Sequence, residues 1–143
     1  MNIHSLGHVF LKVRNQQRAE AFYNGVLGIP IVGQLEQPPM TFFSLGNHHD
    51  FGIFATGDNA QSAPAEAPGL MHVAFKVGDA SGDLWAVRRE LEKAGLEVQF
   101  YDHGVTHSIY VEDPDGNSVE LYVDVSDGWK TQPDLVALGQ STT

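Results

Sequence analysis

Two histidines and one glutamate in this sequence have the residue types and the positions of a metal site. His8 lies in the run GHVFLKV at residues 7–13, and His72 holds the same place in the run MHVAFKV at residues 71–77. Alternation along a strand turns three residues of each run to one face and the histidine to the other; the three are Val9, Leu11 and Val13 in the first run and Val73, Phe75 and Val77 in the second. Glu120 alternates in the same way with the apolar residues of SVELYV at 118–123.

Taken singly, a strand histidine is more often a solvated or hydrogen-bonded side chain than a ligand, and a strand glutamate is usually solvated. The repetition favours a metal site, because it gives two matched histidines. If the two copies pack around a pseudo-two-fold axis, we expect these histidines to converge. Two imidazoles and one carboxylate form the facial triad that suits Fe(II) and leaves coordination positions open.

The elements that position these residues form a tandem repeat. The first module covers about residues 3–57, a linker covers about 58–69, and the second module covers about 70–125. A tail at 126–143 follows, and we expect one domain over 1–143. Each module predicts the element order β-α-β-β-β, so the fold class is α+β.

Helix and turn signals support this division. Asn15 is a suitable N-cap for the first helix, and Gly28 and Gly95 are suitable ends for the two helices. Glycine, proline, aspartate and asparagine in DPDGN at 113–117 predict the turn before the last strand. We expect the remaining strands at residues 29–32, 40–45, 50–56, 96–101 and 108–112.

Composition limits the partners. The chain has 143 residues, no cysteine and a net charge of −10, so a metal must be held by histidine and carboxylate, and nucleic acid and anionic membranes are disfavoured. No apolar stretch approaches the roughly 20 residues of a membrane span. We expect a cytoplasmic protein that binds small molecules or further copies of itself.

The tandem arrangement, the paired His-Val strands and the ending DPDGNSVELY at 113–122 resemble the vicinal oxygen chelate superfamily. This superfamily includes glyoxalase I, fosfomycin and bleomycin resistance proteins, and extradiol ring-cleaving dioxygenases. The resemblance covers about residues 4–125. It implies a cupped mixed β-sheet barrel around a metal, with His8, His72 and Glu120 as ligands, and at least a homodimer.

Three further features resemble the extradiol dioxygenases. Gly52 takes the place in the first module that Glu120 has in the second, where glyoxalase I has a fourth ligand. The segment LGNHHD at 45–50 resembles the one that presents their acid/base histidine. The segment DHGVTHSIY at 102–110 resembles their His-Gly-(Leu/Val)-(Thr/Ser)-His segment and active-site tyrosine.

The resemblance therefore implies a dioxygenase that uses non-haem Fe(II), or Mn(II), and O₂ to cleave a catechol-type aromatic diol. The implied catalytic residues are His49, Tyr110 and His103, and His107 is the implied substrate contact. Strand alternation is expected to turn His48 away from His49.

Two other functions stay open. One is a glyoxalase-type lyase or isomerase, in which a divalent metal stabilises an enediolate. The other is a metal-free drug-binding resistance protein of the same fold. The full set of two histidines and one glutamate argues against the binding protein, and Gly52 argues against the lyase.

Overall fold

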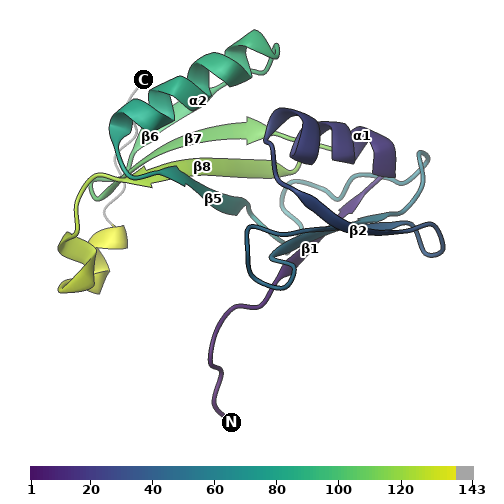
Figure 1. The fold of residues 1–143 in the computed structure, drawn as a ribbon, viewed down its shortest axis with the longest axis horizontal. Coiled ribbons are helices and arrows are strands. Elements are labelled where there is room, and N and C mark those ends of the chain that lie inside the picture. Colours follow the sequence, from purple (N-terminus) through teal and green to yellow (C-terminus); the bar gives the residue numbers. More distant parts are fainter. Residues whose placement is uncertain (138–143) are drawn as a thin grey trace. The chain divides into compact units, whose positions relative to one another are not determined.

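The computed structural model describes residues 1–137 and divides into two compact units, Met1–Ala67 and Pro68–Thr143. Each unit contains one β-α-β-β-β module built on its own four-stranded sheet (Figure 1). Both the α+β class and the tandem modules predicted from the sequence are therefore confirmed.

Unit 1 forms a sheet of strand order β1-β4-β3-β2, in which β1 runs parallel to β4 and the other pairs are antiparallel. Its strands are β1 (Val9–Val13), β2 (Ile31–Leu35), β3 (Met40–Phe43) and β4 (Phe51–Ala55). Between β1 and β2 the chain forms helix α1 (Gln16–Glu20), which continues as a π-helical turn, η1 (Ala21–Val26).

Local signals fix the ends of this helical segment. The Asn15 side chain accepts a hydrogen bond of 3.0 Å from the Arg18 backbone N–H, which confirms the predicted N-cap. Gly28 has φ +72°, a backbone conformation that glycine adopts without a Cβ clash. Ala19, Phe22 and Tyr23 are buried and hold the segment in the core of unit 1.

Unit 2 repeats the arrangement with strand order β5-β8-β7-β6, and again the first strand is parallel to the last. Its strands are β5 (Val73–Gly78), β6 (Gln99–Asp102), β7 (Thr106–Glu112) and β8 (Ser118–Asp124). Helix α2 (Ser81–Lys93) packs on this sheet through the buried Leu84 and Leu91. Two short 3-10 helices, η2 (Gly128–Lys130) and η3 (Pro133–Ala137), follow β8.

The turn into β8 is held by one buried carboxylate. Asp113 is 5% exposed, and its side chain accepts hydrogen bonds from the backbone N–H groups of Asp115 and Asn117. The Asn117 amide donates to the same carboxylate at 2.8 Å. These bonds fix the register in which β8 starts, and therefore the height of Glu120 on the sheet.

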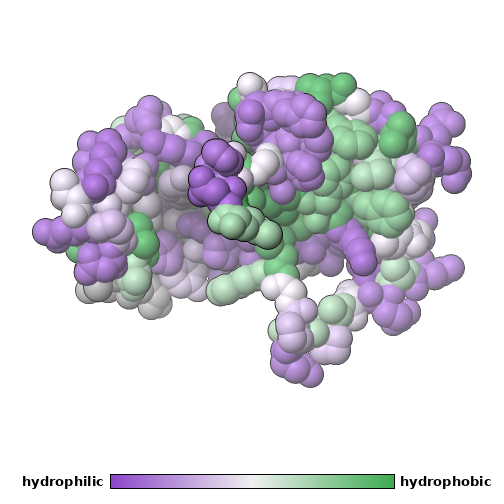
Figure 2. All heavy atoms as spheres, turned by 90° about the horizontal axis from the view of Figure 1, so that it is seen from below, coloured by the Kyte–Doolittle hydropathy of each residue, from purple (hydrophilic) through white to green (hydrophobic). Residues whose placement is uncertain are grey.

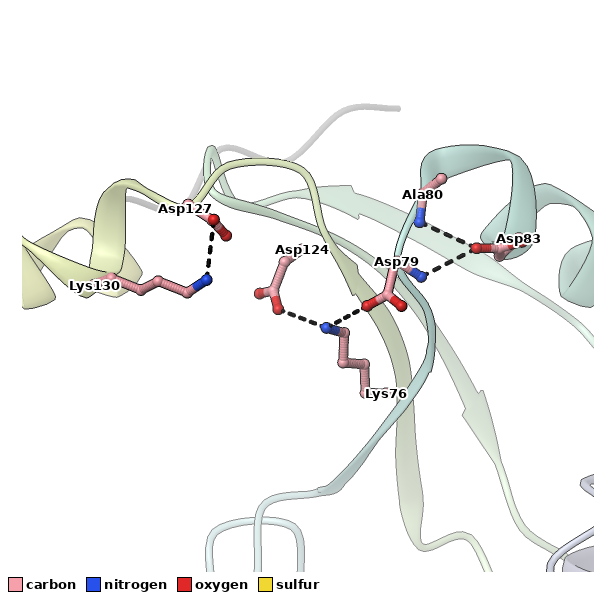
Figure 3. A network of polar contacts seen from close by, with 7 residues as sticks. All are labelled: Lys76, Asp79, Ala80, Asp83, Asp124, Asp127 and Lys130. Atoms are coloured by element: carbon pink, nitrogen blue, oxygen red, sulfur yellow. Dashed lines mark hydrogen bonds and ion pairs between the residues drawn. The ribbon is translucent and has the colours of Figure 1, made fainter.

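A polar network joins the ends of β5 and β8 to the start of α2 (Figure 3). Lys76 Nζ lies 2.8 Å from Asp79 Oδ1 and 3.1 Å from Asp124 Oδ2. Its hydrogen bonds to these two aspartates raise the pKa of the Lys76 ammonium. Asp83 accepts from the backbone N–H groups of Asp79 and Ala80, which secures the first turn of α2.

The expected mixed sheets of the two modules are present, and they are cupped and not closed into a barrel. The described strands form two separate four-stranded sheets, because β1, β2, β5 and β6 each have one strand neighbour and end their sheet. Each sheet packs one face against its helix and turns the opposite face away from it. The candidate site residues lie mainly on these opposite faces.

Large apolar side chains remain exposed in unit 1. They include Val32 and Leu35 on β2 and Leu45 in the turn after β3. Figure 2 shows hydrophobic residues gathered on one part of the surface in that view. Surfaces of this kind are typical of contact sites, and the homodimer expected from the sequence stays a prediction.

No helix among residues 1–137 has the length and apolar character that crossing a membrane requires.

Candidate functional site

The pair His72 and Glu120 forms the centre of the candidate site in unit 2. Glu120 lies in the middle of β8, and its partner across the parallel pairing with β5 is Ala74. His72 precedes Ala74 by two residues and therefore shares its side of the strand. Its Nε2 lies 3.0 Å from Glu120 Oε2, so one imidazole nitrogen and one carboxylate oxygen face each other.

Ser108 fixes the orientation of this carboxylate. Its side chain is fully buried and donates a hydrogen bond of 2.5 Å to Glu120 Oε1. With Oε1 held in this way, the second oxygen is presented to His72. Ser108 is not among the residues predicted from the sequence. Residues two apart on a strand share a face, so Ser108 and Tyr110 point to the same side of their strand. This alternation is the signal in the sequence that could have identified Ser108.

Tyr110 lies beside the carboxylate, because it is the direct partner of Glu120 in the antiparallel pairing of β7 and β8. Burial, and then the charge of Glu120, raise the pKa of Tyr110 to about 12. Its hydroxyl oxygen lies 3.2 Å from His103 Nε2, and its ring contacts that of His72 with centroids 5.6 Å apart. Tyr110 therefore stays protonated at neutral pH and can donate a hydrogen bond.

Tyr101 is a second residue of this site that was not predicted from the sequence. Its ring lies 5.3 Å from the Tyr110 ring and stacks on His103 with centroids 6.0 Å apart. Strand β6 turns Tyr101 to the same face as Ser108, its partner on β7. Unit 2 thus brings together two of the predicted catalytic residues, Tyr110 and His103, with two of the predicted ligands, His72 and Glu120.

His107 lies elsewhere. Its Nδ1 is 3.4 Å from Ser81 Oγ at the start of α2, its Nε2 is 3.8 Å from Asp102 Oδ2, and its ring contacts Phe100. Because His107 is adjacent to Ser108 in β7, it points to the helix-packed face while Ser108 points to Glu120. The structure does not bring His107 together with the other candidate residues of unit 2.

The candidate residues of unit 1 form an aromatic cluster. The ring centroids of His8 and His49 lie 4.4 Å apart. The rings of Phe10 and Phe42 make T-shaped contacts with His49, at 5.9 and 5.3 Å between centroids. The pKa of His49 is lowered from 6.5 by partial burial, then by the positive charges of His48 and His8, against a smaller opposing effect of Asp50. Neutral His49 is therefore favoured at pH 7.

The expected separation of His48 from His49 is wrong. The two rings contact each other with centroids 4.3 Å apart. Strand alternation does not apply here, because β4 begins only at Phe51 and His48 has a left-handed backbone with φ 47°.

The turn that presents His49 is held by Asp50. Its carboxylate accepts a hydrogen bond of 2.6 Å from the Leu45 backbone N–H and a longer one of 3.4 Å from Ser44 Oγ. The Leu45 hydrogen bond is the main reason why the pKa of Asp50 is lowered from 3.8. A carboxyl group with a lowered pKa in the folded state stabilises that state above its usual pKa and loses this effect as the pH falls.

We therefore expect the protection of the Leu45 amide against hydrogen exchange to be constant from neutral pH to about pH 4, and to fall below it. The variant Asp50→Asn, which cannot ionise, should show weak protection of this amide at every pH. NMR-detected exchange provides the measurement. An Asp50→Asn protein whose Leu45 amide is as protected as in the wild type would contradict this role of the carboxylate.

The strand registers place Gly52 in the position of Glu120. Phe10 is paired with Gly52 across β1 and β4, as Ala74 is paired with Glu120 across β5 and β8. On the antiparallel side, Phe42 is paired with Gly52 as Tyr110 is paired with Glu120. The sequence alignment of the two modules is therefore confirmed, and unit 1 has no side chain at the position of the carboxylate.

Within either unit taken alone, the described residues contain no group of three histidine, aspartate or glutamate side chains that could hold a metal ion. The pair His72 and Glu120 nevertheless has suitable donor chemistry, since a nitrogen and an oriented carboxylate oxygen lie at 3.0 Å. The third expected ligand, His8, belongs to unit 1. The predicted ligand set thus draws on both units.

Comparisons with known proteins agree with this architecture. A family model described as Glyoxalase/Bleomycin resistance protein/Dioxygenase superfamily matches residues 5–121. Biphenyl-2,3-diol 1,2-dioxygenase 3 of Rhodococcus globerulus is 36% identical over 83% of this chain and 63% of its own length. A lactoylglutathione lyase of Neisseria meningitidis is 27% identical over 80% of this chain and 86% of its own length.

Solved structures have the same fold. The glyoxylase/bleomycin resistance protein/dioxygenase domain from Frankia sp. superposes with a TM-score of 0.73 at 18% identity, covering 86% of this chain and 99% of that one. The chain spans less than two thirds of the dioxygenase, whereas it spans most of the lyase. From the family match and the paired modules, the chain belongs to the Glyoxalase/Bleomycin resistance protein/Dioxygenase superfamily.

Proposed function

We propose that the chain is a non-haem Fe(II)-dependent extradiol dioxygenase, which cleaves a catechol-type ring and places both atoms of O₂ in the product. The relative from Rhodococcus globerulus, 36% identical to this chain, is named as a biphenyl-2,3-diol dioxygenase. Because the chain spans only 63% of that protein, the activity rests on the site residues as well as on the relative.

One observation carries the proposal: the position in unit 1 that corresponds to Glu120 is Gly52. If His8, His72 and Glu120 held the metal ion, this chain would supply three ligands and leave the remaining coordination positions for a diol and O₂. Bound Fe(II) would supply the redox chemistry that joins the ring to O₂.

The side chains of the protein would accept and donate the protons of the reaction. His49 has a lowered pKa, so its neutral imidazole can accept a proton from a substrate hydroxyl at pH 7 and return it later in the reaction. Tyr110 stays protonated and can donate a hydrogen bond to a substrate oxygen. His103, at 3.2 Å, orients the Tyr110 hydroxyl.

A glyoxalase-type lyase is the second candidate, and the share of the relatives that the chain spans favours it. The lactoylglutathione lyase is matched over 86% of its length, the dioxygenase over 63%. Gly52 opposes this reading, because it supplies no fourth ligand.

Reaction assays distinguish the two. We expect protein loaded anaerobically with Fe(II) to consume one O₂ per biphenyl-2,3-diol or simpler catechol and to give a yellow ring-opened product. Protein without metal, and Glu120→Ala protein treated in the same way, serve as controls. If the protein takes up no oxygen with any catechol but turns over a hemithioacetal of glutathione, the dioxygenase proposal is refuted and the lyase is supported.

A further inference from the structure

Position 52 lies buried in the middle of β4, and a glycine is required there for a reason other than backbone conformation. Its φ lies outside the left-handed region, so its conformation is one that other residues adopt. A Cβ at this position would instead lie 2.3 Å from Cε1 and Cζ of Phe10 and 2.8 Å from its Cδ1. These distances are far inside van der Waals contact, so the Phe10 ring occupies the space that a side chain would need.

The Phe10 ring is held in this place by its neighbours. It makes edge contacts with Phe42 at 5.5 Å, with His8 at 5.6 Å and with His49 at 5.9 Å between centroids. Turning the ring away from Gly52 would break these aromatic contacts, each of which is stabilising. Relieving the clash by a movement of Phe10 would therefore cost these aromatic contacts.

The same positions in unit 2 have the opposite sizes. Ala74 stands in the place of Phe10, and Glu120 stands in the place of Gly52. A small residue on the first strand of unit 2 leaves room for a long carboxylate on the last strand. In unit 1 a large ring on the first strand is matched by the absence of a side chain on the last.

We propose that Phe10 limits the chain to three protein ligands, because its ring fills the space from which a side chain at position 52 would reach the metal. The effect of Phe10 on metal binding rests on the proposed function, because it presupposes the metal site. The steric part rests on unit 1 alone. Phe10 is thus a residue that sets ligand number without itself being a ligand.

The steric part is tested on metal-free protein with Gly52→Ala, Phe10→Ala and the double variant, by melting temperature in the presence of a chelator. We expect Gly52→Ala to lower the melting temperature by about 5 °C or more in the wild-type background. In the Phe10→Ala background the same change should have almost no effect. An equal loss in both backgrounds would overturn the proposal.

The ligand part is tested with Phe10→Ala/Gly52→Glu and, as a matched control, Phe10→Ala/Gly52→Gln. Zn(II) affinity is measured by competition with a chromophoric chelator. Since even the partner of a ligand contributes roughly 10–100-fold to metal affinity, we expect the Glu variant to bind one Zn(II) per chain about 10-fold tighter than the Gln variant, or more.

Equal Zn(II) affinities in the Glu and Gln variants, with a wild-type protein that binds Zn(II), would overturn the ligand part. A wild-type protein that binds no Zn(II) in this assay would contradict the proposed metal site instead. The melting temperatures would then decide the steric role of Phe10, so the two failures are distinguishable.

Discussion

Replacing Glu120 with alanine should remove tight metal binding. Wild-type protein is expected to hold about one Fe(II), or Mn(II), per chain through two imidazoles and one carboxylate. Without Glu120 two imidazoles remain, which are too few to fix the coordination geometry, so affinity should fall by roughly 100-fold or more. His8→Ala and His72→Ala should have the same effect, and metal analysis after gel filtration measures it.

Variants of Ser108 should lower the metal affinity less than the loss of a ligand does. Ser108→Ala keeps all three ligands but frees Glu120 Oε1, which accepts the Ser108 hydrogen bond at 2.5 Å. Metal affinity should fall by about 10-fold, and Ser108→Thr, which retains the hydroxyl, should restore most of it. Circular dichroism of each variant shows whether the fold is retained. A folded triple variant of the ligands with stoichiometric iron would refute the site.

Replacing His49 with alanine should separate binding from chemistry. Iron content and catechol affinity should stay within a few-fold of the wild type, because the ligands are unchanged. Turnover should fall by roughly 10² to 10⁴-fold, the usual contribution of a positioned acid or base. Single-turnover kinetics and a metal assay on the same sample measure both quantities.

The controls for His49 follow from its neighbours. His4 is exposed and precedes β1, so His4→Ala should be silent. His48→Ala should have an intermediate effect, because its ring contacts that of His49 at 4.3 Å. If His49→Ala loses the iron instead of the turnover, His49 is a ligand and not the acid/base.

Sequence patterns predicted the modules well because several local signals agree. The repeated His-Val strands located β1 and β5, and Asn15 and Gly28 located the ends of the first helical segment. The π-helical turn at 21–26 was not predicted, since apolar residues spaced by three and four do not reveal how the backbone is hydrogen-bonded. Strand patterns also do not specify which strands form the sheet edges, so the strand order of each sheet comes from the structure alone.

The candidate site was predicted in part, for similar reasons. Alternation along β8 correctly separated Glu120 from the apolar residues of that strand, and its contact with His72 is present. The strand predicted at 108–112 does not include His107, whereas β7 begins at Thr106 and turns His107 toward α2. The role of Phe10 could not be seen from the sequence, because it depends on which residue faces Gly52 across two paired strands.

The parallel pairing of first and last strands in each unit has a consequence for how the chain folds during synthesis. β1 has no strand partner until β4 has been made, and β5 has none until β8 has been made. Contacts between distant parts of a chain form slowly, since the intervening loop must first be closed. Unit 1 can complete its sheet while unit 2 is still being translated, whereas β5 stays without its strand partner until β8, the last strand of the chain's two sheets, has been made.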